Sequence, residues 1–119
     1  MKYGNKKVVV DGIQFDSKKE ARRYCELKLL QRAGRIKDLE LQKEFELIPA
    51  QFEDVPDAKS GKLKRKCIEQ ACKYKADFCY KQDGQLRVED TKSRATKTKD
   101  YIIKRKLLLW KYGIKIIEI

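Results

Sequence analysis

The 119-residue sequence contains no histidine and no apolar run long enough to cross a membrane. The missing histidine excludes every site that depends on an imidazole. Any acid–base or metal chemistry must therefore use carboxylates, lysines, tyrosines or thiols. The chain begins MKYGNKKVVVDG, which lacks the long apolar segment of a secretory signal. We therefore expect a cytoplasmic protein with no membrane partner.

The four cysteines include no CxxC pair, although zinc sites usually have closely spaced ligands. Cys25 falls in an apolar stripe at helical spacing, and Cys79 lies between Phe78 and Tyr80. We expect reduced thiols that are buried as small apolar side chains. A zinc site made of Cys25, Cys67, Cys72 and Cys79 is the less favoured alternative.

Positive charge, in contrast, is abundant. The chain has 30 Lys and Arg residues against 18 Asp and Glu residues, a formal net charge of +12. A nucleic acid is the expected partner, because lysines and arginines that neutralise phosphates release condensed counterions. Four lysines near the second predicted helix are candidates for backbone phosphate contacts, with an ordinary solvated surface as the alternative: Lys97, Lys99, Lys104 and Lys106.

Local patterns predict a mixed α/β fold in one domain over residues 1–119. Asp11-Gly12 and Asp83-Gly84 each lie between alternating runs and predict hairpins, the first within an N-terminal segment 1–16. Helices are predicted from Asp16 or Ser17 to Gly34 and from Tyr101 to Gly113, with Tyr101 and Trp110 in the core. One or two strands are expected over 36–50 and a closing strand over 114–119. Residues 50–62 look like a loop, within a 50–73 insert of unknown role.

The second hairpin brings two carboxylates together. Alternate residues from Leu86 to Lys92 share a strand face that begins apolar and ends in Asp90 and Lys92. The turn places Asp77 opposite or near Asp90, and facing carboxylates repel unless a cation lies between them. Mg²⁺ or Mn²⁺ suits ligands that are all oxygen, and Lys92 is placed to assist an attacking water and a phosphate.

Asp77 followed by Asp90-Thr91-Lys92 resembles the D…(D/E)xK signature of the PD-(D/E)XK nuclease superfamily. FDSKKEARRY, LQKEFEL, ADF and VEDTKS together look like a small phage and prophage family of nuclease-like proteins. The resemblance implies a restriction-endonuclease-like αβββαβ core with a mixed sheet between helices. It also implies that Glu20, from the first helix, joins Asp77 and Asp90 as a metal ligand. The implied catalytic residues are these three carboxylates and Lys92.

The resemblance further implies an Mg²⁺- or Mn²⁺-dependent DNA endonuclease in a bacterial host cell. It also suggests branched DNA, such as a four-way junction, as the substrate, and a homodimer as the active form. Ala76 stands where the proline of the superfamily name would be. A protein that binds nucleic acid without cleaving it is the alternative function, and an RNA nuclease is a third.

Each site residue also has a structural explanation. Ser17 to Glu20 reads as an S-x-x-E capping box, in which Glu20 serves its own helix. A surface ion pair between Asp90 and Lys92, which would contribute little to stability, is the less favoured alternative to a functional role. Glu89 points to the opposite face by parity and is only a reserve ligand.

Overall fold

The computed structural model describes residues 7–119, and the described part is a mixed α/β structure. Its order is β1 (Val8–Val10), β2 (Ile13–Phe15), α1 (Lys18–Arg32), β3 (Lys37–Ile48), β4 (Gln51–Pro56), β5 (Leu63–Glu69), β6 (Cys72–Gln82), β7 (Gln85–Asp90), the short 3-10 helix η1 (Arg94–Thr96), α2 (Lys99–Tyr112) and β8 (Ile117–Glu118).

Both predicted hairpin turns are confirmed. Asp11 and Gly12 connect β1 to β2, and Asp83 and Gly84 connect β6 to β7. All four have φ between 53° and 76°, the left-handed conformation that two-residue hairpin turns require. The first six residues of the predicted 1–16 segment lie outside the described residues.

Both helices begin and end close to the predicted residues. The Ser17 side chain accepts a hydrogen bond at the start of α1, and the Thr98 side chain does the same for α2. Gly113 ends α2 in the left-handed conformation (φ 69°), and Gly34 (φ 77°) follows the C-cap of α1. Local capping chemistry therefore fixes the extent of both helices.

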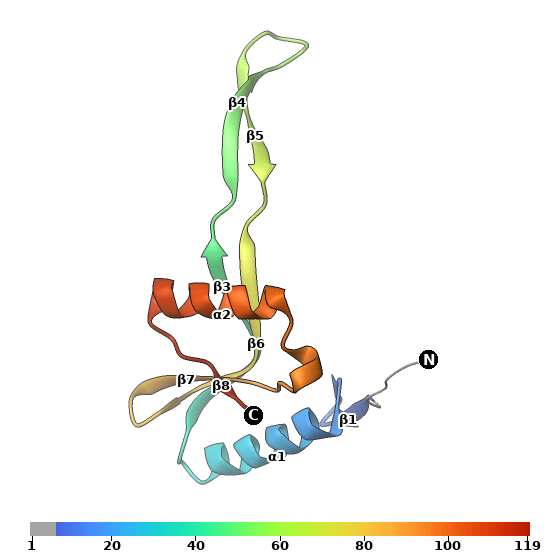
Figure 1. Ribbon diagram of the computed structural model, residues 1–119, viewed down its shortest axis with the longest axis vertical. Coiled ribbons are helices and arrows are strands. Elements are labelled where there is room, and N and C mark those ends of the chain that lie inside the picture. The colour runs from blue at the N-terminus through green and yellow to red at the C-terminus, as the bar shows by residue number, and fades with distance from the viewer. Residues whose placement is uncertain (1–6) are drawn as a thin grey trace.

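The central sheet has the strand order β3-β6-β7-β8, in which β8 runs parallel to β7 and the other neighbours are antiparallel. The two helices cover opposite faces of this sheet (Figure 1). The α1 face buries Phe15, Ala21, Tyr24, Leu27, Ile36, Phe78 and Tyr80. The α2 face buries Phe45, Leu47, Tyr74, Ala76, Cys79, Val88, Tyr101, Leu108 and Ile116.

Strand β6 changes the face to which its even-numbered side chains point. The strict alternation of a strand would put Tyr74, Ala76, Phe78 and Tyr80 on one face, but Tyr74 and Ala76 pack with α2, whereas Phe78 and Tyr80 pack with α1. The pairing of β3 with β6 skips Asp77 and its counterpart Gln42, which has φ 54°. The left-handed Gln42 interrupts the alternation of β3, directly opposite the point where β6 changes face at Asp77, a predicted site residue.

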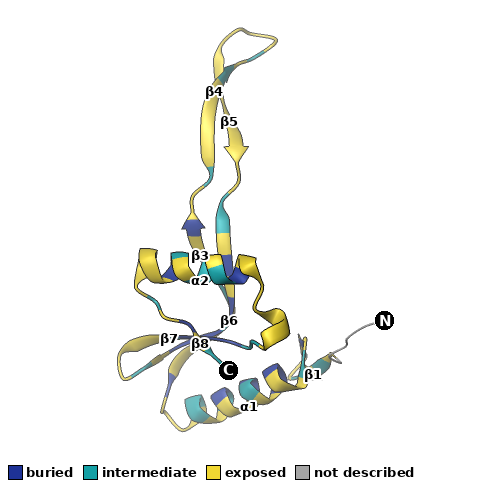
Figure 2. Cartoon of the chain, in the orientation of Figure 1, coloured by how far each residue is buried: buried dark blue, intermediate teal, exposed yellow. Residues whose placement is uncertain are grey.

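The expected loop over residues 50–62 is also wrong. Residues 51–69 form a β-hairpin, β4 paired with β5, that continues the β3–β6 ribbon and projects from the body (Figure 1). Almost every residue of this hairpin is exposed (Figure 2). The sequence there contains Pro, Ser and Gly, but only Asp57 to Lys62 form the connecting turn. We call residues 51–69 the arm.

Two expectations about burial are wrong. Cys25 and Cys67 are exposed, and only Cys79 of the four cysteines is fully buried. Tyr101 is buried as expected, but Trp110 is 81% exposed because it lies on the outer side of α2. In residues 7–119, neither helix has the length and apolar character needed to cross a membrane.

Candidate active site

Four side chains from three separate parts of the chain line one open pocket of about 350 Å³: Glu20, Asp77, Asp90 and Lys92. The start of α1, the middle of β6, the end of β7 and the segment through η1 form its walls. Ser17, Thr91 and Ser93 complete much of the lining. The structure therefore brings together all four residues that the sequence identified as a site.

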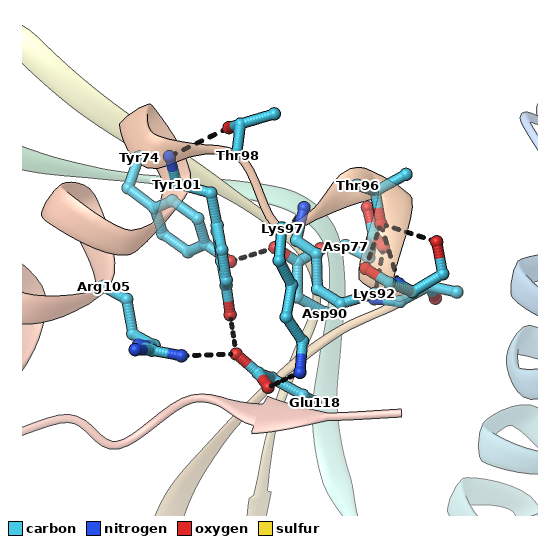
Figure 3. A network of polar contacts seen from close by, with 12 residues as sticks. Tyr74, Asp77, Asp90, Lys92, Thr96, Lys97, Thr98, Tyr101, Arg105 and Glu118 are labelled. Carbon is cyan, nitrogen blue, oxygen red and sulfur yellow. Dashed lines mark hydrogen bonds and ion pairs between the residues drawn. The ribbon is translucent and has the colours of Figure 1, made fainter.

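Asp90 is the most enclosed of these carboxylates, with 3% of its surface exposed. It accepts a short hydrogen bond from the Tyr74 hydroxyl, and its Oδ2 lies 3.4 Å from the Lys92 ammonium (Figure 3). Burial, helped by the neighbouring Asp77, raises its pKa to about 6, although Tyr74 and Lys92 act in the opposite direction. The Asp90–Lys92 ion pair exists, but it is not on the surface.

Asp77 sits at the point, described above, where β6 changes face. Its Oδ2 accepts a hydrogen bond of 2.9 Å from the Thr91 backbone N–H, and Gln42 Nε2 lies 3.4 Å from its Oδ1. The β6–β7 register pairs Phe78 with Glu89, so its continuation places Asp77 opposite Asp90, as the hairpin turn predicted. Asp77 and Asp90 therefore share a face at the point where β6 changes sides, and both line the pocket.

Glu20 combines a helical role with a place in the pocket. Its backbone N–H donates to Ser17 Oγ at 3.1 Å, which is the Ser17 half of the capping box. Its side chain is buried, and among residues 7–119 no Lys or Arg forms an ion pair with it. Burial and then the charges of Asp77, Asp16 and Asp90 raise its pKa to about 7. The pocket therefore destabilises the ionised form of Glu20, and no paired cation in residues 7–119 compensates its charge.

No preformed metal cluster is present in the described part of the chain, since no three acidic or thiol side chains converge closely enough to hold an ion. The three carboxylates line a common space without meeting at one point. The Thr91 hydroxyl on the same wall is buried and has no hydrogen-bond partner among residues 7–119. The pocket thus has more carboxylates than cations among its lining residues, Asp16, Glu20, Asp77 and Asp90 against Lys19 and Lys92.

A second polar network borders the pocket on the α2 side (Figure 3). Glu118 of β8 accepts a hydrogen bond from the Tyr101 hydroxyl at 2.6 Å and pairs with Lys97 at 2.9 Å and Arg105 at 3.0 Å. These donors, Tyr101 first, lower the pKa of Glu118 to about 2. The Lys92 ammonium lies 4.4 Å from the centre of the Tyr101 ring, so the network also positions Lys92.

The four lysines predicted to contact phosphates differ in their surroundings. Lys97 is engaged by Glu118, whereas Lys99 and Lys106 are exposed and Lys104 is half-buried. In residues 7–119, none of the last three forms an ion pair. Lys97 is therefore the least available of the four.

The sequence did not identify the partner of Glu89. Arg23 binds this buried carboxylate with two hydrogen bonds of 2.7 Å, and the Tyr80 hydroxyl donates a third. We call Arg23, Glu89 and Tyr80 the clamp. Arg23 follows Glu20 by one helical turn and Glu89 precedes Asp90, so the clamp fixes the start of α1 against β7. No pattern in the sequence near Arg23 or Glu89 signals this contact, which joins residues 66 positions apart.

The chain belongs to a family described as "Protein of unknown function (DUF1064)", whose family model matches residues 1–117. No curated protein and no solved structure matches the chain.

Proposed function

We propose that this member of a family of unknown function is a metal-dependent endonuclease that hydrolyses phosphodiester bonds in DNA. One observation carries the proposal. Glu20, Asp77, Asp90 and Lys92 are far apart in the sequence, yet they line the same pocket. Three carboxylates around an open, polar space suit a divalent ion, and a lysine beside them suits a phosphate, so the set fits phosphodiester hydrolysis assisted by such an ion.

The arrangement of the elements supports a restriction-endonuclease-like core. Omitting the terminal hairpin and the arm, the order is helix, three strands, helix and strand, and the sheet is mixed with helices on both faces. This is the order that the resemblance implies. Fold alone does not establish an activity, so the proposal depends on the pocket.

The chemistry of the pocket fits Mg²⁺ or Mn²⁺. Glu20, Asp77 and Asp90 offer only hard oxygen donors, and the raised pKa values of Glu20 and Asp90 reflect burial and carboxylate repulsion that a cation would relieve. Asp77 and Asp90 would hold the ion, with Glu20 completing the set. Once bound, such an ion polarises a phosphoryl oxygen and lowers the pKa of a coordinated water.

The protein's own groups orient the reaction. The Thr91 N–H and the Tyr74 hydroxyl each fix one carboxylate by a hydrogen bond, to Asp77 and Asp90 respectively. Lys92 places a positive charge at the wall of the pocket, where it stabilises negative charge developing on a phosphate. Its position over the Tyr101 ring limits how far that charge moves.

A cleavage assay tests this proposal. Purified protein is incubated with linear, flapped and four-way DNA and with RNA of matched sequence, with Mg²⁺, Mn²⁺ or EDTA. We expect metal-dependent cleavage of DNA that is lost in Asp77→Asn, Asp90→Asn and Lys92→Met. Glu44→Gln, which removes an exposed carboxylate from β3, should cleave like the wild type.

The same assay separates the alternatives. A wild type that binds DNA but cleaves no form of it with either metal is a non-catalytic binding protein. Cleavage of RNA alone identifies an RNA nuclease. The four-way junction tests the proposed action on branched DNA, and the mass of the protein in solution tests the proposed homodimer.

A further inference from the structure

The arm forms a two-stranded sheet of its own, joined to the rest of the described protein through β3 and β6. Strands β4 and β5 pair only with each other, and all but a few residues of the arm are exposed (Figures 1 and 2). A two-stranded hairpin is at best marginally stable alone in water. The ordered continuation of β3 and β6 holds it in place, so the arm presents two open faces to a partner.

The two faces of the arm differ in chemistry. The register pairs Phe52 with Cys67 and Pro56 with Leu63, which places apolar side chains on one face. Arg65 belongs to that face, and its guanidinium lies 3.8 Å from the centre of the Phe52 ring. The basic residue on this face is thus held against its own strand pair.

The other face is a row of lysines. Lys64 pairs with Val55 and Lys66 with Glu53, and Lys62 leads into the same face from the turn. Alternate residues of a strand are about 7 Å apart, so the row spans about 14 Å. Although Glu53 lies opposite Lys66, no ion pair involves any of these three lysines among residues 7–119. We call Lys62, Lys64 and Lys66 the lysine face.

We propose that the lysine face of the arm binds the phosphates of duplex DNA, outside the pocket that contains Asp77 and Asp90. Duplex DNA carries one negative charge per ~1.7 Å of helix axis, so it matches a row of unpaired lysines over that length. A two-stranded β-ribbon also fits the major groove of B-form DNA. This inference rests on the proposed function, and it names the form of the substrate.

The arm reaches a suitable distance from the pocket. It joins β6, the strand that carries Asp77, and Lys66 precedes Asp77 by 11 residues. That length of chain spans at most about 40 Å, close to one helical turn of B-DNA. A duplex of somewhat more than one turn is therefore long enough to contact both the pocket and the lysine face.

Two other occupants fit less well. The lysine face of one copy would repel the same three lysines of a second copy, so we do not expect it to form the contact of the proposed homodimer. The major groove of an RNA duplex is deep and narrow and does not admit a β-ribbon. Charge and shape together favour DNA.

Binding without cleavage provides the test. Fluorescence anisotropy in EDTA measures the affinity of a 30-base-pair DNA duplex between 50 and 200 mM salt. The triple variant Lys62→Gln, Lys64→Gln, Lys66→Gln should bind roughly ten- to a hundredfold more weakly, with a shallower dependence on salt. The matched control replaces with Gln three basic residues that are not part of the arm: Lys28 of α1, Arg35 in the connection that follows it, and Lys37 at the start of β3. Circular dichroism confirms that each variant is folded.

The outcomes are distinct from those of the cleavage assay. Equal affinity for the arm variant and the wild type overturns the inference, whether or not the protein cleaves DNA. Equal weakening in the control also overturns it, because the effect would then be one of total charge. RNA duplex bound as tightly as DNA, or a dimer that dissociates in the arm variant, would assign the lysine face to another partner.

Discussion

Glu89 and Asp90 are neighbours on β7 and are about equally buried, with 1% and 3% of their surfaces exposed, but their surroundings differ. In the clamp, Glu89 receives two hydrogen bonds from Arg23 and one from Tyr80. Asp90, on the opposite face, shares its pocket with Asp77 and Glu20. Its one cation, Lys92, is 3.4 Å away.

The difference separates a carboxylate with a structural role, Glu89, from one that we propose has a functional role, Asp90. A buried charge that is fully paired holds two elements together, and losing one partner is costly. A buried carboxylate whose pKa is raised by its surroundings lowers the stability of the fold when it is ionised. Such carboxylates are typical of functional sites. The carboxylate of the clamp is compensated within the fold, whereas the carboxylates of the pocket are only partly compensated, and the proposed metal ion would bind there.

The largest expected effect distinguishes the two carboxylates by activity. Asp90→Asn should reduce Mg²⁺-dependent cleavage by a factor on the order of 10³ or more, equivalent to about 4 kcal/mol, because it removes a proposed metal ligand. Its circular dichroism and melting temperature at pH 8 should match or exceed those of the wild type. A folded Asp90→Asn protein that cleaves at the wild-type rate would exclude Asp90 from the reaction.

The second prediction concerns the clamp. Arg23→Ala leaves Glu89 buried without its cation and should lower the free energy of unfolding by about 3 kcal/mol. Arg22→Ala is the matched control, because Arg22 is exposed on the same helix, and it should change stability by less than about 0.5 kcal/mol. Urea denaturation measures both. Equal small effects would show that the clamp does not hold α1 to β7.

Sequence reasoning succeeded where the determinants are local. The Asp83-Gly84 turn fixed the register that sets Asp77 against Asp90, and Ser17 fixed the start of α1, which carries Glu20. Each inference used a few adjacent residues whose backbone preferences are strong. The candidate site followed from these two features together with the family resemblance.

Sequence reasoning failed for contacts between residues far apart in the sequence and for features that no local residue pattern signals. Arg23 meets Glu89 across 66 positions, and no local pattern indicates that contact. The left-handed conformation of Gln42 has no glycine or asparagine to signal it. The arm resembles a loop because neither of its faces is buried, so the apolar alternation of a half-buried strand is absent.

The third prediction uses the pH dependence of stability. The pKa of Glu20 is raised to about 7 and that of Asp90 to about 6, so the folded state binds more protons than the unfolded state between pH 4 and pH 7. The free energy of unfolding contributed by the pocket should therefore fall as pH rises through this range, by on the order of 1–2 kcal/mol. Thermal melts in EDTA at constant ionic strength measure it.

Adding Mg²⁺ sharpens that measurement. A divalent ion binds the ionised carboxylates, so it should raise the melting temperature at pH 8 and have little effect at pH 4. Asp90→Asn should lose most of the Mg²⁺ effect, whereas Arg22→Ala should keep it. A Mg²⁺ effect that is equal at both pH values and in Asp90→Asn would arise outside the pocket.

The smallest expected effect comes from two matched hydroxyls. Tyr74 donates a hydrogen bond to Asp90 and Tyr80 donates one to Glu89, so Tyr74→Phe and Tyr80→Phe each remove one donor from one carboxylate. Because the Tyr74 bond lowers the pKa of Asp90, Tyr74→Phe should raise that pKa above 6, whereas Tyr80→Phe should leave it unchanged. Both should cost about 1 kcal/mol of stability. Titration of the carboxyl carbons by NMR reads the pKa directly, and equal shifts in the two variants would mean that the two faces of β7 are electrostatically coupled rather than separate.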